Sequence, residues 1–170
     1  MKGNSIVDDT KIDLCMEMMK KAKRLHKTLL LPVDSRASKI FPDPIDNPKV
    51  EYKEMSVKEF DKNYEGLDAG PETIKQILEA MSKAKTILWN GPIGLFENQN
   101  FAVGTYCVAK EMALLTKKGV VTIVGGGDSA SAINQFGLAK DVTHVSTGGG
   151  ASLEFLKGEP LPGIECLSDK

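Results

Sequence analysis

The chain has 170 residues, of which 41% are hydrophobic and 26% are charged, and its formal net charge is -1. These values describe one ordinary soluble domain, and the near-neutral charge provides no basic surface for nucleic acid or for an anionic membrane. The three cysteines are far apart and show no metal-binding spacing, which favours a reducing, cytoplasmic setting. No segment near the start resembles a signal peptide, and no stretch approaches the ~20 apolar residues of a membrane span.

The first predicted element is an amphipathic helix from Asp8 to about Lys27, whose apolar stripe we expect to pack against a core. The segment from Thr28 to Val33 is apolar and predicts a short buried strand that ends at Pro32. Residues 34 to 70 are the least regular part of the chain, because their prolines prevent a helix. Within them, residues 50 to 55 alternate as in a short exposed strand.

The second half alternates strands and helices. A helix begins at Pro71, and the elements expected after it are a strand at 86–90, a helix at 101–117, a strand at 120–124, a helix from 128 to about 137, a strand at 142–146 and a short helix at 153–156. We expect no regular structure in the tail from Gly158 to Ile164. This order predicts an α/β fold, namely a three-layer αβα, Rossmann-like, mostly parallel sheet that lacks its first strands.

Three glycines, Gly125 to Gly127, follow the buried strand at 120–124 and precede a helix start at Asp128 and Ser129. The side chains of Asp or Ser at a helix start can cap its free N–H groups, and the helix dipole makes this end positive. A strand, a glycine loop and a helix start together form a cradle for phosphate. A tight turn that needs glycine for its backbone has the same sequence, and this motif alone does not separate the two interpretations.

Two other strands also end in glycine loops, at residues 90–97 and 147–152. In an open parallel sheet such loops meet at the carboxyl edge, where ligands bind. Asp128 is the only carboxylate inside the cradle and is able to hold Mg²⁺ or simply to cap the helix. Glu97 is able to accept ribose hydroxyls or to be a solvated surface acid. A dinucleotide site is the competing interpretation, since Gly125, Gly127 and Ala130 fit a loose G-x-G-x-x-G spacing, whereas a Walker pattern is absent from the sequence.

Six segments in order give the chain a specific resemblance to the phosphoglycerate kinase family: Leu31 to Asp34, Gly66 to Pro71, Trp89 to Glu97, Val124 to Ala130, His144 to Glu154 and Leu161 to Gly163. The resemblance begins around Gly3 and implies the carboxyl-terminal part of the nucleotide-binding domain of a two-domain kinase. Residues 1–156 then belong to that domain. Residues 157–170 form an extended tail that packs on the other domain, which is absent from this chain.

The resemblance also implies an activity and its residues. The parent enzyme transfers a phosphoryl group between ATP and 3-phosphoglycerate to give 1,3-bisphosphoglycerate in glycolysis, as a cytoplasmic monomer that uses Mg²⁺ with ATP or ADP. Asp128 meets the metal, Glu97 takes the ribose, and 3-phosphoglycerate binds through the absent domain. The remaining nucleotide-binding residues implied are Gly66, Asn90, Gly91, Pro92, Ile93, Gly94, Phe96, Gly125, Gly126, Gly127 and Ser129. The catalytic positions implied are Gly127, Gly149 and Gly150, which face the transferring phosphoryl group.

For the chain on its own, we expect weak nucleotide binding at most and no turnover, because phosphoryl transfer in a two-domain kinase needs closure of both domains. A non-catalytic nucleotide-binding or interaction module built on the same sheet is the alternative. A nicotinamide-dependent dehydrogenase ranks third.

Overall fold

The computed structural model of the protein describes residues 3–146 and 148–168. Thr147, which opens the third predicted glycine loop, lies outside these residues. The chain folds as two compact units. Unit 1 contains the residues up to Glu79 together with Ile93–Gly104, and unit 2 contains Ala80–Pro92 together with the residues from Thr105 onward.

Unit 1 is built on an antiparallel sheet with the strand order β2-β1-β3. Its strands are β1 (Asp34–Ser38), β2 (Lys53–Ser56) and β3 (Glu65–Ala69), and a short 3-10 helix, η2 (Val57–Glu59), follows β2. Ala37, Phe60 and Tyr64 form one buried cluster of this unit, and Val50, Leu67 and Phe101 form another. The predicted strand at 50–55 is therefore confirmed at its second half, whereas two further strands lie in a region predicted to be irregular.

The amino-terminal expectations need two corrections. The predicted helix forms as η1 (Asp9–Lys11) and α1 (Ile12–Arg24). The expectation that its apolar stripe packs against a core is wrong, because no residue of α1 is buried among the described residues. The segment at 28–33 is not a buried strand, since it has no regular structure and Leu29, Leu30 and Leu31 are about half exposed. An apolar run becomes a buried strand only where other strands and side chains cover it, and the described residues supply no such cover here.

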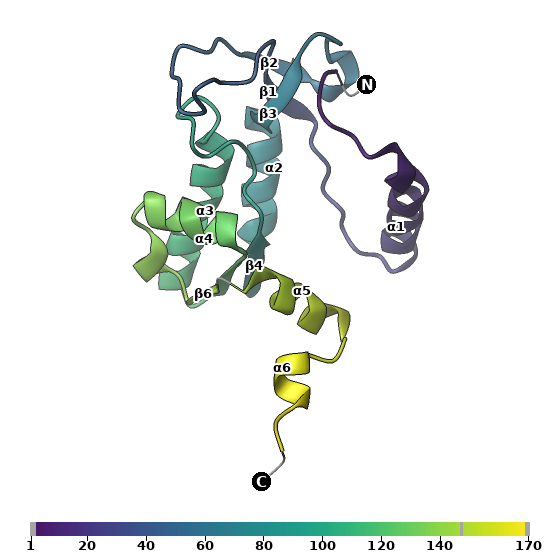
Figure 1. The fold of residues 1–170 in the computed structure, drawn as a ribbon, viewed down its shortest axis with the longest axis vertical. Helices are drawn as coiled ribbons and strands as arrows, with labels where there is room; N and C mark the ends of the chain where they lie inside the picture. The colour runs from purple at the N-terminus through teal and green to yellow at the C-terminus, as the bar shows by residue number, and fades with distance from the viewer. Residues whose placement is uncertain (1–2, 147, 169–170) are drawn as a thin grey trace. The chain divides into compact units, whose positions relative to one another are not determined.

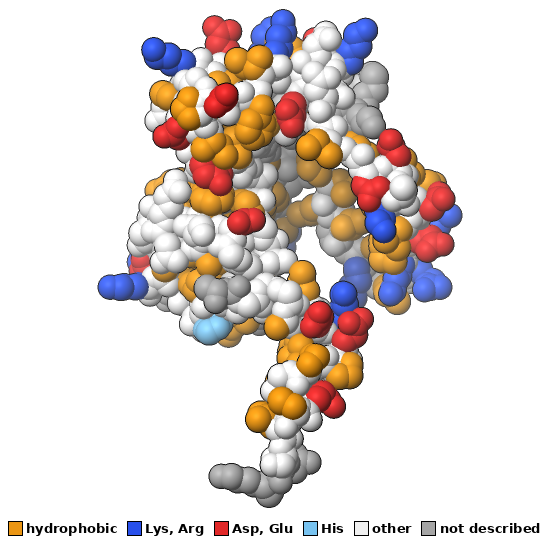
Figure 2. All heavy atoms as spheres, viewed as in Figure 1, with side chains coloured by type: hydrophobic (Ala, Val, Ile, Leu, Met, Phe, Trp, Pro, Cys, Tyr) orange, Lys and Arg blue, Asp and Glu red, His pale blue; other side chains and the backbone are white. Residues whose placement is uncertain are grey.

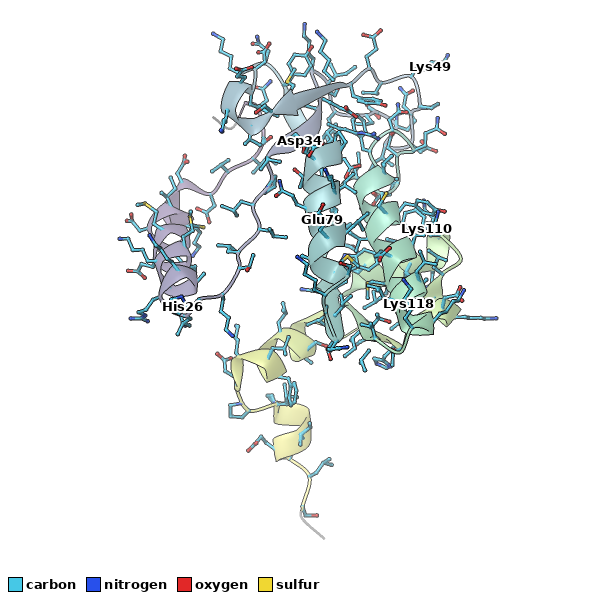
Figure 3. The ribbon with its side chains drawn as sticks, turned by 180° about the vertical axis from the view of Figure 1, so that it is seen from behind. His26, Asp34, Lys49, Glu79, Lys110 and Lys118 are labelled. Carbon is cyan, nitrogen blue, oxygen red and sulfur yellow. The ribbon has the colours of Figure 1, made fainter. Side chains whose placement is uncertain are left out.

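Helix α2 (Pro71–Met81) begins at the predicted proline, and its first turn is held by a residue from β1. The Asp34 carboxylate accepts hydrogen bonds from the backbone N–H groups of Glu72 (2.9 Å) and Thr73 (2.8 Å) and from the Thr73 hydroxyl (2.6 Å). The Thr73 hydroxyl oxygen in turn accepts the N–H groups of Val33 and Asp34. Figure 3 shows Asp34 at this end of α2. Asp34 thus joins the start of β1 to the start of α2.

Unit 2 contains a parallel sheet with the order β4-β5-β6, formed by β4 (Thr86–Asn90), β5 (Val121–Gly125) and β6 (His144–Ser146). Helix α3 (Val103–Lys117) connects β4 to β5, and α4 (Gly127–Gln135) and η3 (Ala139–Asp141) connect β5 to β6 (Figure 1). Met112, Val124 and Ile133 are fully buried in its core. The predicted α/β fold with a parallel sheet flanked by helices is confirmed. None of the helices in residues 3–146 and 148–168 is both long and apolar enough to cross a membrane.

The carboxyl-terminal segment differs from its prediction at two points. Helix α5 (Gly149–Lys157) begins at the glycines themselves rather than at Leu153, and a short helix, α6 (Pro162–Glu165), forms in the tail. Pro162 occupies the first turn of α6, where a missing N–H is tolerated. Apolar side chains of this segment are exposed on its surface (Figure 2), including Phe155 at 68% and Leu167 at 69%.

Candidate functional site

The three parallel strands of unit 2 end on one row of residues. Asn90, the last residue of β4, pairs with Gly125, the last residue of β5, and Gly125 pairs with Ser146, the last residue of β6. The loops after these strands therefore leave the sheet side by side at its carboxyl edge, as the sequence predicts. Each of the three loops contains a glycine within two residues of its strand, namely Gly91, Gly126 and Gly148.

Side chains fix the first of these loops, at Gly91. Its N–H group donates to the hydroxyl oxygen of Ser129 (2.7 Å), and its carbonyl oxygen accepts the indole N–H of Trp89 (2.6 Å). Trp89 and Ser129 are both buried. Because Ser129 lies in the first turn of α4, its hydroxyl ties the loop after β4 to the helix after β5.

The second and third loops approach each other at backbone distance. A Cβ added to Gly149 would lie 2.6 Å from the Cα and 3.2 Å from the backbone nitrogen of Gly126. A Cβ added to Gly126, which has a φ of +92°, would lie 2.6 Å from the side-chain oxygen Oδ1 of Asn90. Gly126 is therefore required mainly by its backbone conformation, and Gly149 by space, since real side chains do not approach backbone atoms this closely. Asn90, Gly126 and Gly149 meet at one point of the edge.

The amino-terminal end of α4 is open. Its N-cap residue is Gly126, which provides no side-chain cap. Within the described part of the chain, no atom lies within 4 Å of the position of a Cβ on Gly127. The expectation that Asp128 or Ser129 caps this helix is wrong, because Ser129 accepts from Gly91 and Asp128 lies in the exposed first turn. The uncapped N–H groups and the helix dipole thus leave this end free to bind an anion. Helix α5 begins in the same way, at Gly148, without a side-chain cap.

Asp128 is exposed, and among residues 3–146 and 148–168 its carboxylate has no hydrogen-bond or ion-pair partner. Nor do the described residues contain a group of three or more His, Cys, Asp or Glu side chains able to hold a metal ion. Mg²⁺ fits this donor set, because it is bound through one or two carboxylates and completes its six oxygen ligands with phosphates and water. A transition metal that needs several protein ligands does not fit it.

The remaining predicted binding residues lie in unit 1, on β3 and on the loop that precedes α3. Gly94 is packed so tightly that a Cβ there would clash with the Asp68 carboxylate and lie 2.5 Å from the carbonyl oxygen of Phe101. Phe96 is buried and Glu97 is exposed. Gly66 lies on β3, where a Cβ would be 2.8 Å from the hydroxyl oxygen of Ser35. The structure therefore gives Gly66 and Gly94 a packing reason in addition to any role in binding.

Asp68 is a buried acid with a shifted pKa that was not predicted as a site residue from the sequence. It is 4% exposed, and its carboxylate accepts the N–H groups of Gly104 (2.9 Å) and Ala69 (2.8 Å). Burial raises the pKa of Asp68 to about 6, while these hydrogen bonds and the charge of Arg36 act to lower it. Asp68 thus caps α3 from β3, as Asp34 caps α2 from β1. The sequence feature that could have identified Asp68 is its place in the Gly66–Pro71 segment, because a lone acid between apolar and small residues needs a hydrogen-bond partner when it is buried.

Comparisons with known proteins place this geometry in a family. A family model described as "Phosphoglycerate kinase" matches residues 1–159. A phosphoglycerate kinase from Chlorobium phaeovibrioides is 48% identical over 98% of this chain and 41% of its own length. A relative from Arabidopsis thaliana, "Phosphoglycerate kinase 3, cytosolic", is also 48% identical, over 98% of this chain and 40% of its own length.

Solved structures agree with the relatives found by sequence. The phosphoglycerate kinase of Coxiella burnetii has a TM-score of 0.87 and 34% identity, covering 97% of this chain and 41% of that protein. That of Pyrococcus horikoshii has a TM-score of 0.63 and 31% identity, covering 88% of this chain and 38% of that protein. The chain spans about two fifths of the length of the curated relatives it matches.

Proposed function

The chain belongs to the phosphoglycerate kinase family, and we propose that it carries the Mg-nucleotide-binding part of a kinase that transfers a phosphoryl group reversibly between ATP and 3-phosphoglycerate. The product is 1,3-bisphosphoglycerate, and the reaction belongs to glycolysis in the cytoplasm. The observation that carries the proposal is the row formed by Asn90, Gly125 and Ser146, which brings three glycine loops to one edge. The enzyme as a whole acts as a monomer, without nucleic acid or membrane partners.

The residues of unit 2 bind the phosphates in this proposal. The first-turn N–H groups of α4, from Gly127 to Ser129, donate to phosphate oxygens, and the dipole of α4 adds favourable charge. Gly126 and Gly149 let backbone approach backbone, so that donors from two loops reach one phosphate chain. Among the described residues, no atom stands near the position of a side chain on Gly127 or Gly150, which leaves room for the transferring group.

Asp128 holds Mg²⁺ in this proposal. When bound, the ion neutralises charge on the phosphate oxygens, which is a principal contribution to phosphoryl transfer. Asp128 suits this role because its carboxylate is exposed and has no partner within the described part of the chain. Since the acceptor is a carboxylate, the proposal needs no strong general base, and the work of this chain is to position groups and to balance charge.

The residues of unit 1 and of the loop after β4 bind the rest of the nucleotide. Glu97 accepts the ribose hydroxyls, and its exposed position is compatible with this role. Asn90, Gly91 and Pro92 are the proposed nucleotide-binding residues at the end of β4 and in the loop after it, in unit 2. Those of unit 1 are Gly66, Ile93, Gly94 and Phe96.

The rest of the family's length supplies the other substrate site. We infer that 3-phosphoglycerate binds there, and that the 170-residue chain alone binds nucleotide weakly at most and without turnover. We also infer that residues 1–156 belong to the nucleotide-binding domain and that residues 157–170 pack against the other domain. The exposure of Ile164 (62%), on α6, and of Leu167 (69%), just after it, supports this packing, because exposed apolar side chains favour a covering surface.

Titration calorimetry of the chain with Mg-ADP and with NAD tests the proposal. We expect heat of binding with Mg-ADP only, lost in Asp128→Ala and retained in Asp46→Ala, which removes an exposed acid from a loop of unit 1. Binding of NAD instead would favour a dehydrogenase and refute the proposal. A coupled kinase assay at normal rates with the chain alone would refute the inference that turnover needs the other domain.

A further inference from the structure

We propose that unit 1 contains a second anion site, a cavity lined by residues at the end of β1 and the start of β2, that binds a small phosphorylated molecule. The cavity has a volume of about 550 Å³, and the residues that line it are Ser38, Lys39, Ile40, Lys49, Glu51, Tyr52, Lys53 and Tyr64. Ligand pockets have volumes of about 300–1,000 Å³, so this space suits one small molecule rather than a segment of a macromolecule. None of these residues belongs to the proposed nucleotide site.

The lining is basic. It contains three lysines and one acid, so its formal charge is positive although the whole chain has a net charge of -1. Among the described residues, the ammonium groups of Lys39, Lys49 and Lys53 have no carboxylate partner. Three unpaired ammonium groups around one cavity attract a multivalent anion, and phosphate oxygens accept hydrogen bonds from lysine.

Tyr64 holds two of these lysines close together. The Nζ atom of Lys39 lies 5.6 Å from the centre of the Tyr64 ring, and the Nζ atom of Lys53 lies 5.9 Å from it. The ring is buried, and it therefore gives both ammonium groups a fixed neighbour. The backbone adds to this order, because Lys53 pairs with Ala37 across β1 and β2, and Lys39 follows two residues later in the chain.

The loop that carries the third lysine is also fixed. Figure 3 shows Lys49 on the loop between β1 and β2. The side-chain amide of Asn98, which is fully buried, donates to the carbonyl oxygens of Ile45 and Asn47, both at 2.9 Å. The amide of Asn100 donates to those of Pro48 (2.9 Å) and Val50 (3.1 Å). Hydrogen bonds on both sides of Lys49 preserve the wall of the cavity, which reduces the entropy lost when an anion binds.

The chemistry of the remaining lining indicates what the anion carries. Tyr52 is 40% exposed and Ile40 is 63% exposed, so an apolar or ring portion of the ligand has a surface to contact. Glu51 is the one lining acid, and it opposes the phosphate. A phosphate monoester or diphosphate of a small organic molecule therefore fits the cavity best.

Metal-free inorganic pyrophosphate is the probe for the phosphate part of this site. We expect its addition to shift the amide resonances of residues 38–40 and 49–53 in a nitrogen-proton NMR spectrum of the whole chain, with affinity that falls as salt is added. Shifts that also occur at residues 126–129 are assigned to the glycine edge and leave the proposal standing. Shifts confined to that edge, or the absence of shifts, would overturn it.

Matched variants test which charges bind the probe. The double variant Lys39→Gln with Lys53→Gln should weaken binding at residues 38–40 by roughly five- to tenfold, since two ammonium contacts are lost. The control, Lys110→Gln with Lys118→Gln, removes the same charge from α3 and the turn after it, where Lys110 also lies over a tyrosine ring, at 6.0 Å from the centre of Tyr106. Glu51→Gln should tighten binding. An equal effect of both double variants, or weaker binding in Glu51→Gln, would overturn the proposal.

Discussion

Because the second and third glycine loops approach each other closely, we predict different effects on stability when Gly149 and its neighbour Gly150 are each replaced by Ala. Replacement of Gly149 by Ala places a Cβ 2.6 Å from the Cα of Gly126, whereas unstrained carbon contacts are about 3.5–4.0 Å. The loops must therefore move apart by roughly 1 Å, and overpacking of this kind costs about 1–3 kcal/mol. At Gly150, one residue along the same helix, no atom of residues 3–146 and 148–168 lies within 4 Å of an added Cβ. There the better helix propensity of Ala stabilises the protein by up to about 1 kcal/mol.

Urea unfolding followed by tryptophan fluorescence measures this difference. Trp89 is the only tryptophan of the chain, it is buried, and it contacts the Gly91 carbonyl oxygen at the same edge. We expect Gly149→Ala to unfold at a lower urea concentration than the unmodified chain, and Gly150→Ala at the same or a higher concentration. Calorimetry should also show weaker Mg-ADP binding for Gly149→Ala, because displacement of the Gly126 backbone moves the phosphate donors. Equal stability and equal binding in the two variants would refute the inferred contact between the loops.

Three further predictions concern hydrogen bonds that hold a loop or a helix start in place. Ser129→Ala should lower the free energy of unfolding by about 1–2 kcal/mol, because the Gly91 N–H loses its acceptor, whereas the exposed Ser131→Ala should change it little in the same urea titration. The pKa of Asp34 lies below its ordinary value because hydrogen bonds from the Thr73 hydroxyl and from backbone N–H groups outweigh the opposing effect of burial. The stability that Asp34 adds is therefore present above pH 4 and is lost as the pH falls further. Thr73→Val should reduce that acid loss in unfolding titrations at pH 3 and 7, and an unchanged loss would contradict this account. The pKa of Asp68 is raised to about 6, so its contribution to stability is complete below pH 4 and is lost as the pH rises through 6. Asp68→Asn should remove this decline, which unfolding titrations between pH 4 and 7 would show, and a decline of equal size in the variant would rule the assignment out.

The parallel half of the fold was accessible from the sequence because its signals are local. The run from Val120 to Val124 is apolar and β-branched, glycines follow it directly, and the helix after it has a regular apolar stripe. The row of strand ends follows from the general behaviour of parallel sheets once these strands are recognised. For the same reason, the glycines and Asp128 were found as a candidate site, although their roles in binding stay predictions.

The antiparallel half was not accessible in this way because tertiary contacts determine it. The strand β1, with the sequence Asp34 to Ser38, has three polar residues of five before its buried end, so no hydrophobic pattern marks it. Conversely, the segment from Leu29 to Leu31 is strongly apolar but has no cover among the described residues. The start of α5 at Gly149 was missed because glycine has a low helix propensity. The cap of α2 by Asp34 joins residues 38 and 39 positions apart, beyond the range of local motifs.

The two carboxylates that cap α2 and α3 from strands of the same sheet determine when these helix starts become protected from solvent. Glu72 cannot bond its amide to Asp34 before the pairing of β1 with β3 brings Asp34 to the start of α2, and the Gly104 amide needs β3 itself to be in place, because Asp68 is on that strand. Hydrogen exchange at these amides therefore reports the opening of a sheet to which they do not belong. In unit 1, the first turn of α2 and the antiparallel strands therefore form one cooperative element, since a shift of β1 against β3 by one residue moves Asp34 away from the start of α2.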